Sequence, residues 1–217
     1  MIGEFLLNLL FPPKCVLCGA LLEADETDLC RSCRADSPEC AKNKLKFPFL
    51  DSWVAIWYYK GDVRESLHRY KFQGRRHYGA VYGRLLAMRI LQEYPDGFDV
   101  LTWIPVSPLR RFTRGFDQVE LIARALGQEL GMEPVAVLKK VRHNRPQSGI
   151  SGYAVRRANV LGVYRVTAPD FVSGKRVLLL DDIITTGATA GECARELLTA
   201  GAKEVHCGCV AAAVNRK

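Results

Sequence analysis

The run of residues 177–190, VLLLDDIITTGATA, constrains the fold and chemistry of this 217-residue chain more than any other segment. An apolar stretch typical of a buried strand ends in Asp181 and Asp182, passes through a threonine-rich turn and enters a helical pattern. Gly187 lets the backbone turn tightly, and the N–H groups around it open a helix whose dipole favours an anion. Ionised carboxylates only accept hydrogen bonds, so the two aspartates suit neighbouring hydroxyl groups such as those of a ribose. The run therefore predicts a site for a sugar phosphate.

Two common nucleotide-binding motifs do not explain this run. The motif G-x-x-x-x-G-K-[ST], which holds nucleoside triphosphates, does not occur in the sequence, and no G-x-G-x-x-G follows an early strand. Simple helix capping after a strand would account for one aspartate and one threonine, but not for the whole run. The expected ligand is therefore a phosphate monoester with adjacent hydroxyl groups.

Strand and helix patterns alternate along the chain after residue 48. Strands are expected at residues 53–59, 100–106, 135–141, 160–166, 176–181 and 205–214. Helices are expected at residues 62–72, 78–94, 117–130 and 189–200. This alternation predicts an α/β fold with a parallel sheet covered on both faces, in which ligands bind at the carboxyl ends of the strands.

Four of the eight cysteines have the spacing of a structural zinc site. Two C-x2-C pairs, eleven residues apart, can place four thiolates at the corners of a tetrahedron about 2.3 Å from a zinc ion. Gly19 supplies the tight turn after the first pair. Four ligands leave no open position for catalysis, so zinc is expected to stabilise a small module; a redox pair or free thiols are the alternatives. The predicted ligands are Cys15, Cys18, Cys30 and Cys33.

The remaining cysteines do not share this spacing. Cys207 and Cys209 alternate along an expected strand and Cys193 lies on an expected helix, so all three are interpreted as buried free thiols. Cys40 follows the second pair by seven residues and is interpreted as either a surface thiol or a substitute ligand.

The apolar N-terminus, MIGEFLLNLLFPP, lacks the basic region and the cleavage site of a signal peptide. Its apolar residues recur at helical spacing up to Pro12, which predicts an amphipathic helix that packs on the core or docks on a partner or membrane surface. No apolar run approaches the roughly 18 residues that cross a membrane. We expect a soluble, cytoplasmic protein without a transmembrane segment.

The net charge of +8 is concentrated in the middle of the chain. Residues 60–157 contain 18 lysines and arginines against 9 acidic residues, whereas the remainder contains 13 against 14. Several arginine clusters fall in expected loops, where guanidinium groups can bind phosphate at two points. The pattern predicts a polyanionic partner, either a small polyphosphate or a nucleic-acid backbone, although a solvated charged face is the simpler alternative.

At residues 177–190 the chain resembles the phosphoribosyl pyrophosphate (PRPP) motif of type I phosphoribosyltransferases at every position. Most of the chain resembles one branch of that group, the ComF family of competence proteins. The shared segments are the four-cysteine module, YKFQG at 70–74, IPV at 104–106, RR at 110–111, RGFDQ at 114–118, RPQ at 145–147 and RRAN at 156–159. The chain departs from the family pattern at Ser107, where a second proline is common, and at Asp117, where asparagine is common.

The resemblance implies a type I phosphoribosyltransferase fold in residues 49–217, preceded by a small zinc-binding module in residues 1–48. It implies that Asp181 and Asp182 hold the ribose of PRPP and that its 5-phosphate binds Thr185, Thr186, Gly187, Ala188 and Thr189. The pyrophosphate would bind Lys71, Pro105, Val106, Ser107, Arg110, Arg111 and Arg114, with magnesium arriving on the substrate. Residues 142–159 would form a lid that includes Arg142, Arg145, Gln147 and Arg156; an idle surface loop is the alternative.

Two functions from different classes follow from this resemblance. The first is a phosphoribosyltransferase that acts on an unidentified acceptor and is associated by family with DNA uptake in natural competence. The second is a non-catalytic competence factor that binds single-stranded DNA and uses the sugar-phosphate site for regulation. Expected partners are PRPP, single-stranded DNA and proteins of the competence machinery such as a helicase.

Overall fold

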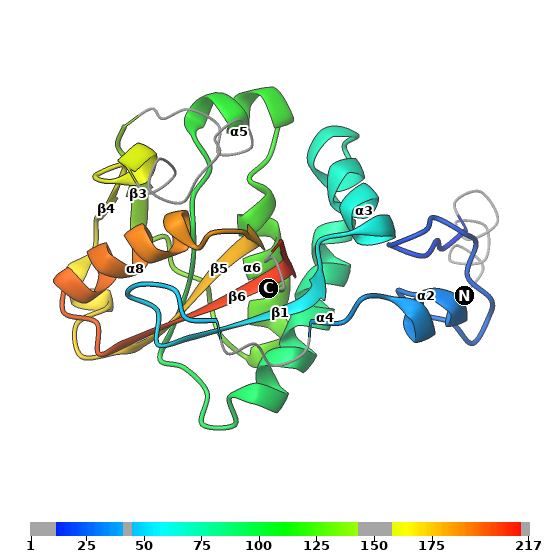
Figure 1. The fold of residues 1–217 in the computed structure, drawn as a ribbon, viewed down its shortest axis with the longest axis horizontal. Helices are drawn as coiled ribbons and strands as arrows, with labels where there is room; N and C mark the ends of the chain where they lie inside the picture. The colour runs from blue at the N-terminus through cyan, green and yellow to red at the C-terminus, as the bar shows by residue number, and fades with distance from the viewer. Residues whose placement is uncertain (1–11, 41–44, 143–157, 214–217) are drawn as a thin grey trace.

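The computed structural model describes residues 12–40, 45–142 and 158–213 (Figure 1). The N-terminal helix expected up to Pro12 lies almost entirely outside these residues, as do positions 143–157 of the expected lid. In the part of the chain that is described, no helix is both long and apolar enough to cross a membrane.

Four parallel strands form the central sheet, as the sequence predicts. Their order is β1 (Ser52–Tyr58), β6 (Glu204–Ala212), β5 (Arg176–Ile184) and β2 (Val100–Trp103). The two central strands are buried along almost their whole length, which explains their near-continuous apolar sequence. The carboxyl ends of β2 and β5 lie side by side in the sheet, with Trp103 opposite Leu180.

Both faces of the sheet are covered, as Figure 1 shows. The helices α3 (Gly61–Phe72), α4 (Tyr78–Glu93) and α6 (Gln118–Leu130) pack on the face that presents Leu178 and Leu180. The opposite face presents Val177 and Leu179 and is covered by α8 (Ala188–Thr199). Side chains of successive strand residues point to opposite faces, so Asp181 belongs to the α8 side of the sheet and Asp182 to the α3 side.

Two expected strands do not join the parallel sheet. β3 (Leu138–Lys140) and β4 (Tyr164–Val166) pair with each other in an antiparallel ribbon beside α8. Each is three residues long with one buried position, and Lys139 and Lys140 could not occupy a sheet that is buried on both faces. The prediction of a parallel strand was therefore wrong for residues 135–141 and 160–166.

Two further elements differ from the expectation. β5 continues through both aspartates to Ile184 instead of ending at Asp181. A helix that was not predicted, α5 (Pro108–Arg114), begins after Ser107, whose hydroxyl accepts the Arg110 N–H at 3.3 Å. It ends at Gly115, which adopts a φ of 73°. A single 3-10 turn, η2 (Pro169–Phe171), precedes β5.

The N-terminal module packs directly on α3 and α4. It contains the short helix α2 (Arg31–Asp36), and its Val16, Leu17 and Leu29 belong to the same buried cluster as Leu67 of α3. Residues 38–40 then run beside the edge strand β1, where the Cys40 N–H donates to the Ile56 carbonyl at 2.9 Å. The module is therefore continuous with the core of the main domain, and the boundary expected at residue 48 stays a prediction.

Candidate functional site

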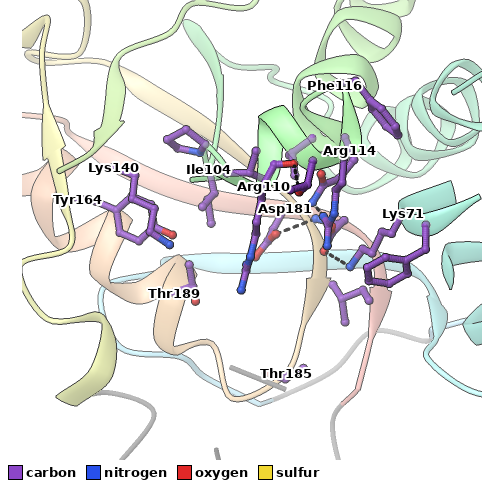
Figure 2. A pocket seen from close by; sticks show the side chains of 18 of the residues that line it. Lys71, Ile104, Arg110, Arg114, Phe116, Lys140, Tyr164, Asp181, Thr185 and Thr189 are labelled. Atoms are coloured by element: carbon purple, nitrogen blue, oxygen red, sulfur yellow. Dashed lines mark hydrogen bonds and ion pairs between the residues drawn. The ribbon is translucent and has the colours of Figure 1, made fainter. Parts of the chain in front are cut away.

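A cavity of about 830 Å³ opens at the carboxyl ends of β2 and β5 (Figure 2). Its walls come from α3, the loop after β2, α5, the β3–β4 ribbon, the end of β5 and the start of α8. Nine residues expected to bind PRPP line it: Lys71, Pro105, Val106, Arg110, Arg114, Asp181, Asp182, Thr185 and Thr189. The structure thus brings together residues from distant parts of the chain.

The Asp182 carboxylate is held from both sides. Lys71 Nζ lies 2.9 Å from Asp182 Oδ1, and Gln118 Nε2 donates to Asp182 Oδ2 at 3.1 Å (Figure 2). The residue is only 7% exposed, so the ion pair is shielded from solvent. Lys71 therefore neutralises an aspartate in this structure, whereas the family resemblance implies a role at the pyrophosphate.

Asp181 lies on the other side of the strand and has no cation against it among the described residues. Its Oδ1 accepts the backbone N–H of Asp182 at 2.8 Å. Burial, followed by the neighbouring charge of Asp182, raises the pKa of Asp181 to about 8. A ligand that brings a cation or hydroxyl donors to this position would favour the ionised carboxylate.

The turn after β5 has the backbone shape that the sequence predicts. Gly187 adopts a φ of 70°, which side chains rarely tolerate, and α8 begins at the next residue. The first N–H groups of a helix have no partner within it, so this end of α8 can donate to an anion. Thr185 and Thr189 face the cavity, whereas Thr186, Gly187 and Ala188 are not part of its wall.

The loop after β2 is fixed by Asp117. Asp117 Oδ2 accepts the Val106 N–H at 3.1 Å, and Oδ1 accepts the N–H groups of Val119 at 3.0 Å and Glu120 at 3.2 Å. The carboxylate therefore caps α6 and holds the loop at the same time. Burial raises the pKa of Asp117 despite these three donors. An asparagine oxygen could accept the two α6 N–H groups, but its amide nitrogen could not accept the Val106 N–H, so asparagine would keep the helix cap and lose the bond to the loop.

Two arginines of α5 face the cavity and one does not. Arg110 and Arg114 line it, and the Arg114 guanidinium carbon lies 4.9 Å from the centre of the Phe72 ring. Arg111 is turned away and lies 3.6 Å from Glu120. Ser107 is buried and caps α5 instead of lining the cavity.

The residues assigned to the lid contribute little to the described site. Arg142 donates to the Leu161 carbonyl at 2.8 Å and is not part of the cavity wall. Arg145, Gln147 and Arg156 lie outside the described residues.

Sequence reasoning missed the wall formed by the antiparallel ribbon. Lys140 and Tyr164, paired across β3 and β4, line the cavity on its α8 side, with Lys140 Nζ 5.7 Å from the centre of the Tyr164 ring (Figure 2). Burial and the nearby Arg110 lower the pKa of Lys140. Gln118 and Phe72 were also missed, although both lie inside segments that carry the family resemblance.

The four predicted zinc ligands come together in the N-terminal module. The sulfurs of Cys15, Cys18, Cys30 and Cys33 all lie within 4.8 Å of one another, and Cys18 Sγ is 3.7 Å from Cys30 Sγ. Two thiolates on one tetrahedral zinc ion are about 3.8 Å apart, so the spacing fits this metal. Backbone N–H groups of Ala20 and Cys33 point at sulfurs at 3.5 Å, and Gly19 adopts a φ of 80° in the expected turn. The module therefore has a closed structural zinc site.

The other cysteines lie in the core. Cys193, Cys207 and Cys209 are fully buried free thiols, as predicted, and burial raises the pKa of Cys193 and Cys209. Cys40 is 3% exposed and is not one of the four clustered thiols. Both interpretations of Cys40, a surface thiol and a substitute ligand, were wrong because residues 38–40 pack along β1.

Comparison with known families defines the class of protein. Residues 113–217 match the phosphoribosyl transferase domain, and residues 6–44 match the double zinc ribbon domain. With the parallel sheet and the four-cysteine cluster, these matches define a type I phosphoribosyltransferase fold joined to an N-terminal zinc ribbon module.

Full-length relatives define the family more narrowly. The chain is 31% identical over 228 aligned positions to the competence protein ComFC of Streptococcus pneumoniae, covering 88% of this chain and 96% of the relative. It is 26% identical over 208 positions to the DNA utilization protein YhgH of Escherichia coli K12, covering 90% and 88%. It is 24% identical over 219 positions to competence protein F of Haemophilus influenzae, covering 89% and 94%. The chain therefore belongs to the ComF family of competence proteins.

A solved structure similar to part of the chain is the glutamine PRPP amidotransferase from B. subtilis, complexed with ADP and GMP. The two share 27% identity over 60% of this chain with a TM-score of 0.40, and the match spans only 25% of the amidotransferase.

Proposed function

We propose that the cavity binds PRPP with magnesium and that the protein is a phosphoribosyltransferase acting on an unidentified acceptor. The observation that carries this proposal is the juxtaposition of two aspartates, an anion-accepting helix start and two arginines around one cavity. PRPP presents the matching groups, a diol between a phosphate and a pyrophosphate.

Each group of PRPP has a matching part of the cavity wall. Asp181 and Asp182, at the end of β5, would accept the ribose hydroxyls, because ionised carboxylates are acceptors only. The N–H groups of residues 185–189 would donate to the 5-phosphate. Arg110 and Arg114 would hold the pyrophosphate, and the neighbouring Pro105 and Val106 would contribute loop backbone, with Lys140 on the opposite wall.

Breaking the bond between ribose C1 and the pyrophosphate oxygen leaves positive charge on the sugar and negative charge on the departing group. The aspartates stabilise the sugar, and the arginines stabilise the pyrophosphate. Magnesium arriving with the substrate would supply further charge neutralisation at the pyrophosphate. A cytoplasmic location is part of this proposal, and the family association with competence supports it.

Calorimetric titration with PRPP and magnesium tests the proposal. We expect micromolar affinity for the wild-type protein and loss of binding in the Asp181→Asn/Asp182→Asn variant. Asp170→Asn is the matched control, because this residue lies in η2 away from the cavity. Equal affinities of the wild-type protein and the double variant would refute the assignment.

One observation favours a second function, the binding of single-stranded DNA. Phe112 of α5 is 86% exposed and lies between arginines, while Phe72 is 61% exposed at the rim of the cavity. Exposed aromatic rings beside cations can stack on bases while the cations bind phosphates. In this function the PRPP site would regulate DNA binding, and proteins of the competence machinery such as a helicase would be the partners.

Filter binding of a single-stranded oligonucleotide tests this second function. Affinity should fall steeply with salt and should drop in Phe112→Ala, but not in Leu91→Ala, which removes another exposed apolar side chain, 57% accessible, from α4. The absence of measurable affinity at low salt would eliminate it.

A further inference from the structure

One helix links the zinc module to the cavity. On α3, the Ser66 hydroxyl and the Arg69 guanidinium donate hydrogen bonds to the carbonyls of Val16 and Leu17 respectively. Val16 and Leu17 lie between the zinc ligands Cys15 and Cys18, so the metal site fixes the two carbonyls that α3 recognises. Ser66 and Val16 are fully or almost fully buried, and such bonds are costly to lose because water cannot replace them.

The last turn of the same helix holds the aspartate at the end of β5. Lys71 Nζ lies 2.9 Å from Asp182 Oδ1. Tyr70 donates to the Gln118 carbonyl at 2.7 Å, and Gln118 donates in turn to Asp182 Oδ2 at 3.1 Å. Both oxygens of the Asp182 carboxylate therefore depend on where α3 lies.

We infer that Arg69 and Ser66 are positioning residues for the cavity: by fixing α3 on the zinc module, they fix Lys71 against Asp182. Apolar packing of α3 on α4 and α6 is non-directional and tolerates a small slide of the helix. The hydrogen bonds from Ser66 and Arg69 to the segment between Cys15 and Cys18 are directional. They therefore fix the position of α3 along its axis. If α3 moves, the buried Asp182 carboxylate loses its ion pair with Lys71. An unpaired buried charge is costly, and here it would lie beside Asp181, whose ionisation is already disfavoured.

The ligand used to test this inference, PRPP, comes from the proposed function, but the contacts of α3 do not depend on that function. A second contact between module and main domain provides a matched control. Arg84 of α4 binds Asp28 of the zinc module through Nε at 3.2 Å and Nη2 at 2.5 Å. Arg84 is not part of the cavity wall, so its loss should weaken the same junction without moving Lys71.

The experiment compares Arg69→Ala with Arg84→Ala. Both variants should retain one zinc ion per chain. Affinity for PRPP with magnesium should fall at least tenfold in Arg69→Ala and stay within twofold of wild type in Arg84→Ala. Hydrogen–deuterium exchange of residues 181–189, measured without ligand, should accelerate only in Arg69→Ala. If Arg69→Ala does not fold, Ser66→Ala removes the neighbouring bond and should show the same pattern.

Two results would overturn the inference. One is unchanged exchange of residues 181–189 in Arg69→Ala. The other is equal acceleration by Arg69→Ala in the wild-type and Lys71→Met backgrounds, because a residue that acts through Lys71 has no effect once Lys71 is gone. Failure of the wild-type protein to bind PRPP would refute the proposed function instead, and the exchange comparison would still decide the inference.

Discussion

At the scale of single residues, Asp117 shows how one carboxylate can organise two elements. It accepts the Val106 N–H of the cavity loop and two N–H groups at the start of α6. In the sequence, Asp117 is notable only because asparagine is common at this position in the family. Its bond to the cavity loop could not be predicted, because Val106 lies eleven residues away in the chain.

Asp117→Ala should lower the free energy of unfolding by about 2 kcal/mol, because it removes a helix cap and leaves the Val106 N–H without its acceptor. Asp117→Asn should cost less, about 1 kcal/mol, because its amide oxygen can still cap α6 and only the Val106 N–H loses its acceptor. Urea denaturation of the three proteins measures both values. Equal losses in the two variants would mean that the oxygen cap on α6 does not stabilise the protein.

Asp181 should impose a pH dependence on stability. Its pKa is raised from 3.8 to about 8 in the folded chain, so the folded state binds the proton more tightly than the unfolded state. The resulting stabilisation is fully present below about pH 4 and is lost as pH rises through about 8. Between these limits the stability of wild type should fall relative to Asp181→Asn in urea titrations. Parallel profiles for the two proteins would show that folding does not shift the pKa of Asp181.

At the scale of elements, the strand, turn and helix around Gly187 could be predicted from sequence because every signal is local. An apolar run, a glycine and a row of threonines are adjacent in the chain. The contact that supports this turn is not local. Phe47 packs on Gly187, where a Cβ would lie 2.3 Å from Phe47 Cδ1.

Gly187→Ala should therefore destabilise the protein more than Gly97→Ala. Both glycines have nearly the same φ, 70° and 67°, but a Cβ on Gly97 would meet nothing within 4 Å. Backbone strain costs about 1–2 kcal/mol in each variant, and the clash with Phe47 adds to it only at Gly187. Thermal denaturation should show the larger loss at Gly187, reduced in a Phe47→Ala background. Identical losses at the two glycines would remove the role assigned to Phe47.

Elements without a local signal were missed or misplaced. None of the residues of α5 is buried, so α5 lacks the apolar periodicity that indicates a helix. Only Ser107 and Pro108 indicate where it begins. The ribbon of β3 and β4 was assigned to the parallel sheet because a short strand does not specify its partner. Lys140 and Tyr164 could not be predicted for the same reason, since only the pairing places them on one wall.

At the scale of the whole molecule, the zinc module and the main domain share one buried core. Val16, Leu17 and Leu29 pack in the same cluster as Leu67 and Tyr70 of α3. The cysteine spacing was sufficient to predict the metal site. It gave no information about the surface on which the module docks, because that surface is created by the fold of the other domain.

Loss of zinc should therefore destabilise the entire chain. Cys18→Ser should abolish zinc binding and lower the melting temperature of a single cooperative transition, because the apolar contacts of the module weaken together with the metal site. Calorimetry with parallel zinc analysis measures this. Two separate transitions, with the second unchanged from wild type, would show that the module and the main domain are energetically independent.

The proposed function requires PRPP to bind in the cavity at the end of β5. A crystal structure of the protein with PRPP and magnesium tests it most directly. We predict that the 5-phosphate lies at the turn of residues 185–189, the ribose hydroxyls at Asp181 and Asp182, and the pyrophosphate against Arg110 and Arg114. An empty cavity at saturating PRPP, or PRPP bound elsewhere on the molecule, would contradict the account.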